Sequence, residues 1–439
     1  MQHFKKSKYT LSVPLASAGE GLSGAYNTVS RGMILATEEA LLRIINTNSL
    51  PGDEPLTELL WEHGLLVPTH TDEDAVFEIW RQQHVHDCST MRSKVVVTRH
   101  CNNRCRYCIV APEATAMSHE TARAMDRYYF KYIENARPEK IRDEFTGGEP
   151  LLNAAIIRES AERRYHYCLG KGIDYGFTFI TNGTLLSPEL IRPMKEIGLE
   201  GIRVSLAGPA EVHDRLRPSS DGGKTYDLIV QNLLKVSGLA PITLECQYDE
   251  GGEDYRRIPE MLEQLKKHGI IIENINFTPI LPRRNGTNDG PVTDGPEILL
   301  HLMREAQANG YPQLQEPPMN CCSAEFLSRV TFDTDGSLIP CPVLQSGEMV
   351  YGNVFTGIDF IAHAQILHRR LPERCLHDCE LLPLCLGGCR LQALICGAGF
   401  NGVNCRYECL RLILEEYIRA SAAQALASAS AVEPRANAA

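Results

Sequence analysis

The feature of this chain that most constrains its fold is an alternation of strand-like and helix-like patterns between residues 93 and 278. Runs of β-branched and other apolar residues predict strands at 93–98, 141–145, 174–180, 201–206, 241–247 and 272–278. Helical patterns such as 119–134 and 254–268 separate them. Units of this kind with short connections imply a parallel sheet with right-handed crossovers. We therefore predict an α/β fold built on a partial (β/α)6 barrel.

Polar, glycine-containing motifs follow successive predicted strands. Residues 146–150 read TGGEP, residues 181–184 read TNGT, and residues 205–209 read SLAGP. Each motif by itself is usually only a turn. The C-terminal ends of parallel strands meet at one edge, where barrels bind their ligands. Three such motifs at successive strand ends therefore indicate a ligand site at that edge.

Three cysteines occupy the loop after the first predicted strand. Cys101, Cys105 and Cys108 have the spacing C-x3-C-x2-C and follow the apolar run 95–97. Fe–S clusters are bound by cysteine thiolates, and three ligands would leave one iron of a four-iron cluster open to a small molecule. Structural zinc sites use four ligands. The spacing therefore favours an Fe–S cluster over zinc or structural thiols.

This triad, with the aromatic Tyr107 before its last cysteine, resembles the signature of the radical S-adenosylmethionine enzymes. The resemblance implies a [4Fe-4S] cluster on Cys101, Cys105 and Cys108 whose open iron binds the amino and carboxylate groups of S-adenosylmethionine. In that family an electron from the cluster cleaves the sulfonium and gives a 5′-deoxyadenosyl radical, which abstracts a hydrogen atom from the substrate. The cofactor carries this chemistry, and the protein orients and shields it.

The same resemblance implies further contacts with S-adenosylmethionine. The GGEP motif matches the family element that contacts the cofactor's amino group, and segment 205–217 is similar to a strand end where a Ser and a later Arg touch it. Many relatives have an Asp where this chain has Ala207, so a role tied to that carboxylate is not carried over. The expected cofactor-binding residues are Tyr107, Gly147, Gly148, Glu149, Asn182, Ser205 and Arg217.

A second group of cysteines begins at residue 321. The pattern Cys322-x13-Gly336-x4-Cys341, followed by C-x3-C-x5-C-x3-C at 375–389, resembles the SPASM domain, which binds two auxiliary Fe–S clusters in peptide-modifying radical enzymes. The usual second block begins C-x2-C, so this chain has one extra residue there. Zinc ribbons are the alternative, because close cysteine pairs also bind zinc.

The family's ligand pairing divides these cysteines into two sets. One cluster would use Cys375, Cys379, Cys385 and Cys405, with Cys409 as the competitor for the last position. The other would use Cys341, Cys389 and one or both of Cys321 and Cys322. Because adjacent cysteines rarely bind one cluster with relaxed geometry, we hypothesise that the second site has three protein ligands and an iron open to a substrate donor.

The rest of the chain is assigned by pattern. Residues 1–90 predict a small α/β module, with strands at 9–14 and 25–35 and helices at 37–47, 54–63 and 72–82. It resembles modules that bind a leader peptide at a sheet edge, and a structural cap is the alternative. The expected order continues with the barrel at 91–280, a linker and helix at 281–315, the SPASM region at 316–412, and a helix end with a disordered Ala/Ser tail, from residue 420, within 413–439.

Charge and hydropathy narrow the expected partners. A net charge of −11 disfavours nucleic acid, whose partners usually carry a basic surface. No apolar run approaches the ~18 residues that span a bilayer, and the first residues are not typical of a secretory signal. The cysteine spacing favours metal over disulfides. We therefore expect a cytoplasmic protein with no nucleic-acid or membrane partner.

These features together predict an enzyme, a radical S-adenosylmethionine/SPASM maturase that cross-links or otherwise modifies side chains of a ribosomally synthesised peptide. A precursor peptide or protein and an electron donor such as flavodoxin or ferredoxin are the expected partners. One alternative is an anaerobic sulfatase maturase, although Cys341 is followed by Pro342 where such relatives carry an Asp. Another is a non-catalytic scaffold that binds metal and leader peptide. Candidate bases are Glu245, Asp249 and Glu250, at the end of the fifth strand.

Overall fold

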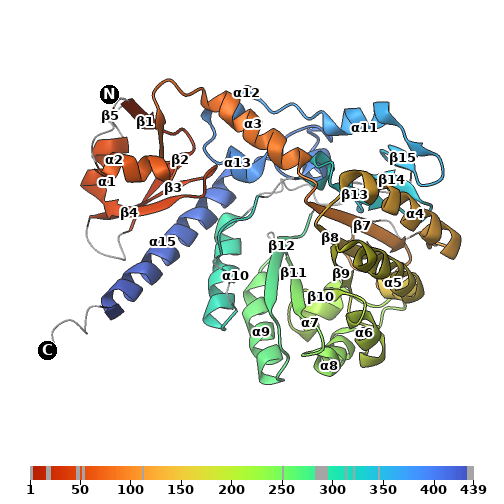
Figure 1. Ribbon diagram of the computed structural model, residues 1–439. Helices are drawn as coiled ribbons and strands as arrows, with labels where there is room; N and C mark the ends of the chain where they lie inside the picture. The colour runs from red at the N-terminus through yellow and green to blue at the C-terminus, as the bar shows by residue number, and fades with distance from the viewer. Residues whose placement is uncertain are drawn as a thin grey trace.

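The computed structural model describes residues 3–15, 21–45, 50–51, 55–110, 113–249, 252–281, 295–311, 313, 315–319, 322–344 and 347–432 (Figure 1). Its centre is a curved parallel sheet of β7 (Thr90–Thr98), β8 (Lys140–Gly147), β9 (Asp174–Thr181), β10 (Leu199–Leu206), β11 (Ile242–Tyr248) and β12 (Asn274–Pro279). These strands lie in sequence order, and each pairs in parallel with the next. The predicted partial barrel is confirmed.

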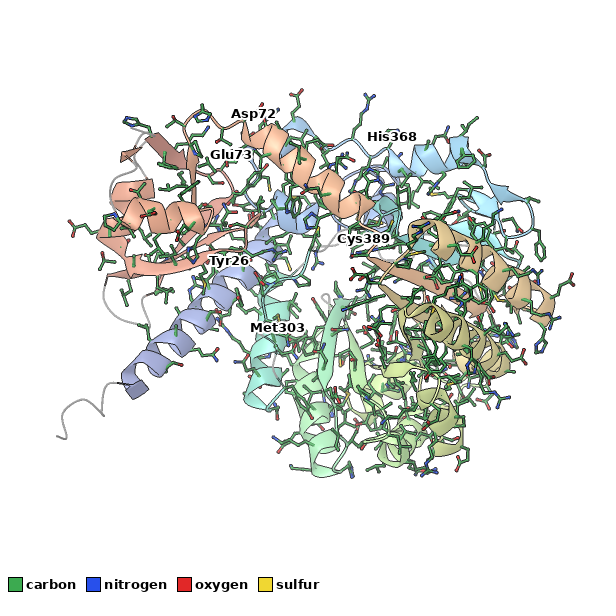
Figure 2. The ribbon with its side chains drawn as sticks, in the orientation of Figure 1. Tyr26, Asp72, Glu73, Met303, His368 and Cys389 are labelled. Atoms are coloured by element: carbon green, nitrogen blue, oxygen red, sulfur yellow. The ribbon has the colours of Figure 1, made fainter. Side chains whose placement is uncertain are left out.

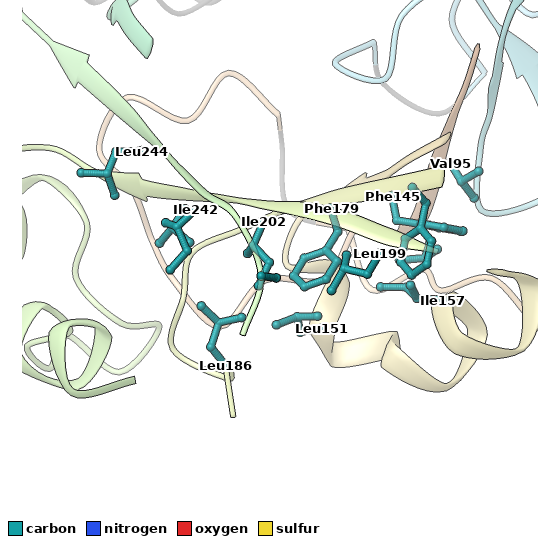
Figure 3. Close-up of a cluster of buried hydrophobic side chains, with 14 of the residues drawn as sticks. Val95, Phe145, Leu151, Ile157, Phe179, Leu186, Leu199, Ile202, Ile242 and Leu244 are labelled. Atoms are coloured by element: carbon teal, nitrogen blue, oxygen red, sulfur yellow. The ribbon is translucent and has the colours of Figure 1, made fainter. Parts of the chain in front are cut away.

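Helices cover the outer face of this sheet. They are α4 (His119–Ala136), η1 (Pro150–Asn153), α5 (Ala154–Lys171), α6 (Pro188–Lys195), α7 (Ala210–Leu216), α8 (Tyr226–Val236), η2 (Asp254–Arg257) and α9 (Ile258–Lys267). Because side chains alternate along a strand, Val95, Phe145, Phe179 and Ile202 all point toward the helices, where they pack with Ile157 of α5 (Figure 3). The opposite, concave face therefore carries the polar side chains.

The cysteine-rich region extends the same sheet beyond β7. Strand β13 (Arg329–Phe332) pairs in parallel with β7, and β14 (Ser337–Ile339), β15 (Gly352–Asn353) and β16 (Gly357–Ile358) follow antiparallel. The helices of this part are α10 (Pro296–Ala308), η3 (Ser323–Glu325), α11 (Phe360–Leu367), α12 (Glu373–Asp378), α13 (Leu382–Cys385), α14 (Arg390–Ile395) and α15 (Tyr407–Val432). The two cysteine-bearing regions are thus joined by one continuous hydrogen-bonded sheet.

The N-terminal elements form two small antiparallel sheets. Strand β1 (His3–Lys6) lies between β5 (Leu50–Pro51) and β6 (Leu66–Pro68), and β3 (Leu22–Asn27) lies between β2 (Thr10–Pro14) and β4 (Met33–Thr37). Helices α1 (Glu38–Ile45), α2 (Pro55–Glu62) and α3 (Glu73–His86) accompany them. None of the helices in the described residues has the length and apolarity needed to cross a membrane.

Two sequence-based expectations are corrected. The predicted strand 25–35 is a hairpin, β3 and β4, because the Asn27 side chain accepts hydrogen bonds from the backbone of Val29 and Ser30 and closes a turn. The tail assigned as disordered from residue 420 is helical as far as Val432. Alanine is the strongest helix former, and Ala422 of α15 is buried beside the N-terminal sheet (Figure 1). Residues 433–439 lie outside the described residues.

Candidate functional site

The cysteine loop after β7 is fixed by backbone hydrogen bonds to the segment after α7. Arg104 N donates to Pro218 O (2.8 Å) and Arg106 N donates to Leu216 O (2.8 Å). Asn103 also forms an isolated bridge with Ser219. The segment at the end of α7 and just after it therefore holds in place the backbone that carries the three thiols.

The three thiols of this loop differ in exposure. Cys101 and Cys105 are partly buried, whereas Cys108 is exposed. Asn103 N donates to Cys101 Sγ (3.4 Å). Burial raises the pKa of Cys101 to about 11, and the neighbouring thiols add to this effect. Because iron binds the thiolate, loading the loop with a cluster must release protons.

The TGGE motif passes directly against the cysteine loop. Gly148 N donates to Thr98 O and Glu149 N donates to His100 O, both at 2.8 Å. A Cβ at Gly148 would lie 2.3 Å from His100 O, and one at Gly147, where φ is +153°, would lie 2.0 Å from Thr98 O. Only glycine permits this close approach. The end of β8 is therefore cradled against the loop that carries Cys101.

The Glu149 side chain joins neighbouring strand ends. It is fully buried, and its carboxylate accepts hydrogen bonds from Leu151 N (3.0 Å), Thr181 Oγ1 (2.7 Å) and Asn182 N (2.7 Å). Burial raises the pKa of this carboxyl, and the hydrogen bonds from Asn182 and Thr181 oppose that shift. The Glu149 carboxylate is already hydrogen-bonded within the protein. The backbone of this motif, rather than the acid, is therefore the part that can contact a ligand.

Asn182 links the end of β9 to the cysteine loop. Its Nδ2 donates to Asn102 Oδ1 (2.7 Å), and its Oδ1 accepts from Thr184 N (2.9 Å) and Thr184 Oγ1 (2.7 Å). Asn102 Nδ2 in turn donates to Thr184 Oγ1 (2.9 Å). Asn102 and Thr184 were not assigned from the sequence, although Asn102 lies inside the cysteine motif.

Arg217 and Tyr107 meet beside the cysteine loop. Arg217 Nη1 donates to the Tyr107 hydroxyl and to Gln247 Oε1 (3.3 Å). Burial alone would lower the pKa of Arg217, but Tyr107 and the thiols of Cys105 and Cys101 hold it above its usual value. Arg217 Nε is buried without a partner in the described residues. The structure thus brings two expected cofactor-binding residues together and leaves one buried donor available at the site.

The concave face of the barrel carries a ladder of charges that the sequence did not suggest. Lys94 pairs with Glu144 (3.1 Å), and Arg203 pairs with Glu144 and with Glu245 (2.6 Å). Asn276 Nδ2 also donates to Glu245 (2.8 Å). Burial raises the pKa of Glu144, but Lys94 and Arg203 outweigh it and keep the pKa below its usual range.

The candidate bases do not all lie in the same place, and one of them lies beside Ser205. Glu245 lies on β11 inside the ladder and pairs in register with Ser205 of β10, and both are buried. Asp249 is exposed. Glu250 lies outside the described residues. Ser205 and Glu245 are therefore on the concave face, whereas Asp249 lies at the surface beyond the strand end.

A buried ion pair that the sequence also missed ties the cysteine loop to the C-terminal region. Arg99 Nε and Nη2 donate to the two oxygens of Asp333 (2.9 and 2.6 Å), and both side chains are 1% exposed. Arg99 stands two residues before Cys101, and Asp333 follows β13. No motif suggests this pairing, because the two residues are far apart in sequence.

Three of the later cysteines form one neighbourhood. Burial raises the pKa of Cys341 to about 11. Cys341 also interacts electrostatically with the thiols of Cys389 and Cys322 and with the ammonium group of Lys94. Cys389 is the N-cap of α14. This set therefore lies beside the charge ladder of the barrel. Cys321 lies outside the described residues, so the structure leaves its place in this set open.

Four other cysteines form a second neighbourhood. Cys375, Cys379 and Cys385 interact electrostatically with one another, and Cys405 interacts with Cys375 and Cys385. Gly387 N donates to Cys385 Sγ (3.2 Å). These four residues are the set that the family pairing implied.

Cys409 lies apart from both neighbourhoods. It is 2% exposed and packs with Leu299 and Met303 of α10 (Met303 is labelled in Figure 2). The structure therefore favours Cys405 over Cys409 as the fourth member of the second set.

The cysteine loop lies beside groups that suit a cofactor with amino-acid functions. In the described residues no three His, Cys, Asp or Glu side chains converge as ligands of one metal ion. A cubane binds its thiolates through different irons, so its ligands need not converge on one point. The partnerless Arg217 Nε and the glycine cradle fit a ligand that carries a carboxylate and an amino group.

In comparisons with known proteins, residues 95–244 match the model of the Radical SAM superfamily. GTP 3′,8-cyclase of Clostridium botulinum (strain Hall) is 28% identical over 273 residues, which cover 56% of this chain and 80% of that protein. A serine-type anaerobic sulfatase-maturating enzyme of Bacteroides thetaiotaomicron is 26% identical over 198 residues, 43% of this chain and 46% of that protein.

Two solved structures are similar over longer stretches. anSMEcpe with bound AdoMet has a TM-score of 0.59 at 17% identity and covers 77% of this chain and 100% of its own. Streptococcus suis SuiB bound to S-adenosylmethionine has a TM-score of 0.54 at 15% identity and covers 92% of this chain and 99% of its own. At these identities the likeness establishes a shared fold.

Proposed function

We propose that this chain, in which residues 95–244 match the model of the Radical SAM superfamily, is a radical SAM enzyme that matures a ribosomally synthesised peptide by modifying its side chains. The observation that carries this proposal is the position of Cys101, Cys105 and Cys108. They lie at the C-terminal edge of the sheet, beside the glycine cradle and Arg217, and two further cysteine sets lie in the C-terminal region whose strands extend the same sheet.

Each residue group at this edge has a defined part in the proposal. Cys101, Cys105 and Cys108 would bind a [4Fe-4S] cluster, and the backbone at 147–148 and the Arg217 guanidinium would bind S-adenosylmethionine. When bound, cluster and cofactor supply the one-electron chemistry that removes a substrate hydrogen atom. The surrounding barrel holds the substrate in place and excludes water.

A peptide is the substrate class we favour. Both structural neighbours have also been solved with a peptide, SuiB with the precursor peptide SuiA and anSMEcpe with the Cp18Cys peptide. The likeness to SuiB covers 92% of this chain. Strand β4 lies at the edge of its sheet in the described residues, where a leader peptide could add as a further strand. The electron donor we propose is a flavodoxin or ferredoxin.

An anaerobic sulfatase maturase is the second candidate, since a serine-type anaerobic sulfatase-maturating enzyme of Bacteroides thetaiotaomicron is among the similar proteins. The family resemblance implies that such maturases carry an Asp next to the corresponding cluster cysteine. Cys341 is followed by Pro342 in this chain. The cross-linking reaction therefore remains our first choice, and formylglycine formation is an outcome that the experiment distinguishes.

The test is an anaerobic assay of the reconstituted protein with S-adenosylmethionine, a reductant and candidate peptides encoded by neighbouring genes. We expect 5′-deoxyadenosine together with a peptide that has lost two hydrogens. Replacing Cys101, Cys105 and Cys108 by alanine should abolish both products. A sulfatase peptide converted to formylglycine would support the second candidate, and GTP consumed in place of peptide would contradict both. A colourless, zinc-containing protein would favour a non-catalytic scaffold.

A further inference from the structure

A buried carboxylate shared by two arginines lies between the two later cysteine sets. Glu325 Oε1 accepts hydrogen bonds from Arg369 Nη1 (2.8 Å) and Arg390 Nε (3.3 Å). The arginine side chains are 1% and 0% exposed, and that of Glu325 is 7% exposed. Glu325 follows Cys322 by three residues, and Arg390 directly follows Cys389. Figure 2 shows Cys389 near the middle of the molecule.

Arg369 holds the segment that connects the two sets. It donates hydrogen bonds to all three carbonyls of residues 386–388 and to Gly402 O (2.6 Å). This segment covalently joins Cys385 of one set to Cys389 of the other. One guanidinium therefore fixes the spacing between the two cysteine sets.

The arginines also act electrostatically on different sets. The thiol of Cys322 accepts a hydrogen bond from the backbone N–H of Arg390 and lies close enough to the Arg390 guanidinium for the two to interact electrostatically. Arg369, through its hydrogen bonds to the carbonyls of residues 386–388, lies beside Cys385 of the other set. Each arginine thus has a nearer set on which its charge acts.

The charges of Glu325, Arg369 and Arg390 do not cancel. Two guanidinium groups share one carboxylate, and the other cation that acts on Glu325, Arg81, already pairs with Glu78 (2.8 Å). Arg369 Nε and Arg390 Nη2 are buried without partners in the described residues. Buried charge and buried donors are costly unless an anion compensates them. Clusters bound by thiolates carry that negative charge.

We propose that Arg369 and Arg390 are positioning residues that balance the charge of the two auxiliary clusters and raise their reduction potentials. Arg390 acts on the cluster of Cys322, Cys341 and Cys389, and Arg369 acts on the cluster of the four cysteines between 375 and 405. The proposal rests on the proposed function, because it requires that both clusters are bound.

The direction of each effect follows from charge. A reduced cluster is more negative, so a nearby cation stabilises it and raises its potential. This interaction is strong because the group is buried and salt screens it poorly. Removing a guanidinium should therefore lower the potential of the nearer cluster, and removing the Glu325 charge should raise the potentials of both.

The experiment is a redox titration followed by electron paramagnetic resonance. It uses protein in which Cys101, Cys105 and Cys108 are alanine, so that only the auxiliary clusters are observed. We expect Arg390→Gln and Arg369→Gln each to shift one cluster to a more negative potential, and Arg390→Lys to restore most of the shift. Glu325→Gln, which keeps the side-chain shape, should shift both clusters to more positive potentials. Arg304→Gln, which removes an exposed arginine paired with Glu416, is the matched control and should shift neither.

The outcomes separate this proposal from the proposed function. Potentials that stay unchanged in Glu325→Gln with full iron content would overturn the proposal alone. A parent protein that lacks iron for two auxiliary clusters would overturn the cluster assignment and this proposal together. Glu325→Gln keeps the test decisive even if an arginine variant fails to fold.

Discussion

At the scale of single residues, the site depends on two positions where the backbone passes so close to a neighbouring segment that only glycine fits. Gly147 and Gly148 bring the end of β8 within hydrogen-bonding distance of the chain that leads into the cysteine loop. The sequence predicted these glycines as ligand contacts. Their close neighbours in the structure are the carbonyls of Thr98 and His100, so they also determine where the cysteine loop lies.

We expect Gly148→Ala to displace the cysteine loop, because its Cβ would lie 2.3 Å from His100 O. Affinity for S-adenosylmethionine should fall at least about tenfold, which corresponds to about 1.4 kcal/mol, and equilibrium dialysis measures it. Gly170→Ala is the matched control, since a Cβ there meets nothing within 4 Å. Gly170 lies in the last turn of α5, so the change should leave the affinity for S-adenosylmethionine unchanged. Unchanged affinity in Gly148→Ala would contradict this account of the cradle.

At the scale of elements, a buried histidine connects α7 to the strand end that precedes it. His213 is fully buried, and its ring contacts Ala207 N (3.4 Å) and Thr225 Oγ1 (3.2 Å). Burial, aided by Arg217, lowers the pKa of His213 to about 3. This helix leads directly to Arg217, so the neutral histidine supports the placement of a cofactor-binding candidate.

The low pKa of His213 makes stability depend on pH. The folded pKa of about 3 lies below the unfolded value of 6.5, so the stabilisation is present above pH 6.5 and is lost as the pH falls from 6.5 toward 3. The loss is at most about 1.4 kcal/mol per pH unit.

Urea unfolding at pH 7 and pH 5 tests this dependence. His213→Gln should show a smaller difference between the two pH values than the parent protein. The exposed His268→Gln should behave like the parent. An equal pH dependence in His213→Gln and the parent would contradict the assignment.

At the scale of the whole molecule, the C-terminal helix joins the first and last parts of the chain. Leu414 and Ile418 of α15 are buried in one cluster with Leu11 and Val13 of β2. The same N-terminal elements reach the cysteine-rich region, where Lys8 Nζ donates to Leu376 O (2.7 Å) between Cys375 and Cys379. The proposed peptide-binding module is therefore packed against one of the proposed cluster sites.

We expect Ile418→Ala to loosen the N-terminal module at a cost of about 2–5 kcal/mol in unfolding free energy. Peptide affinity should fall, because the proposed β4 edge belongs to that module. Cleavage of S-adenosylmethionine without peptide should persist, because the barrel is unchanged. Ala427→Gly on the exposed end of the same helix is the control and should leave peptide affinity intact. Loss of cofactor cleavage with unchanged peptide affinity would contradict this division of roles.

The sequence by itself determined the barrel and predicted which cysteines lie near one another, because both are local signals. Hydrophobic periodicity placed β7–β12, and cysteine spacing grouped Cys375, Cys379 and Cys385. The prediction of disorder at residues 420–432 was wrong. An Ala/Ser-rich composition is typical of disordered segments when the packing partner is not known. The segment continues helix α15, and Ala422 within it is buried in one cluster with residues of the N-terminal sheet.

Only the tertiary structure decided how distant segments meet. The Arg99–Asp333 pair, the charge ladder through Glu144 and Glu245, and the group of Glu325 with its two arginines join residues that no local pattern relates. Ion pairs and hydrogen bonds of this kind depend on spatial position rather than on sequence spacing. The sequence motifs therefore indicate the chemistry. The charges that surround the site are brought together only when the whole chain folds.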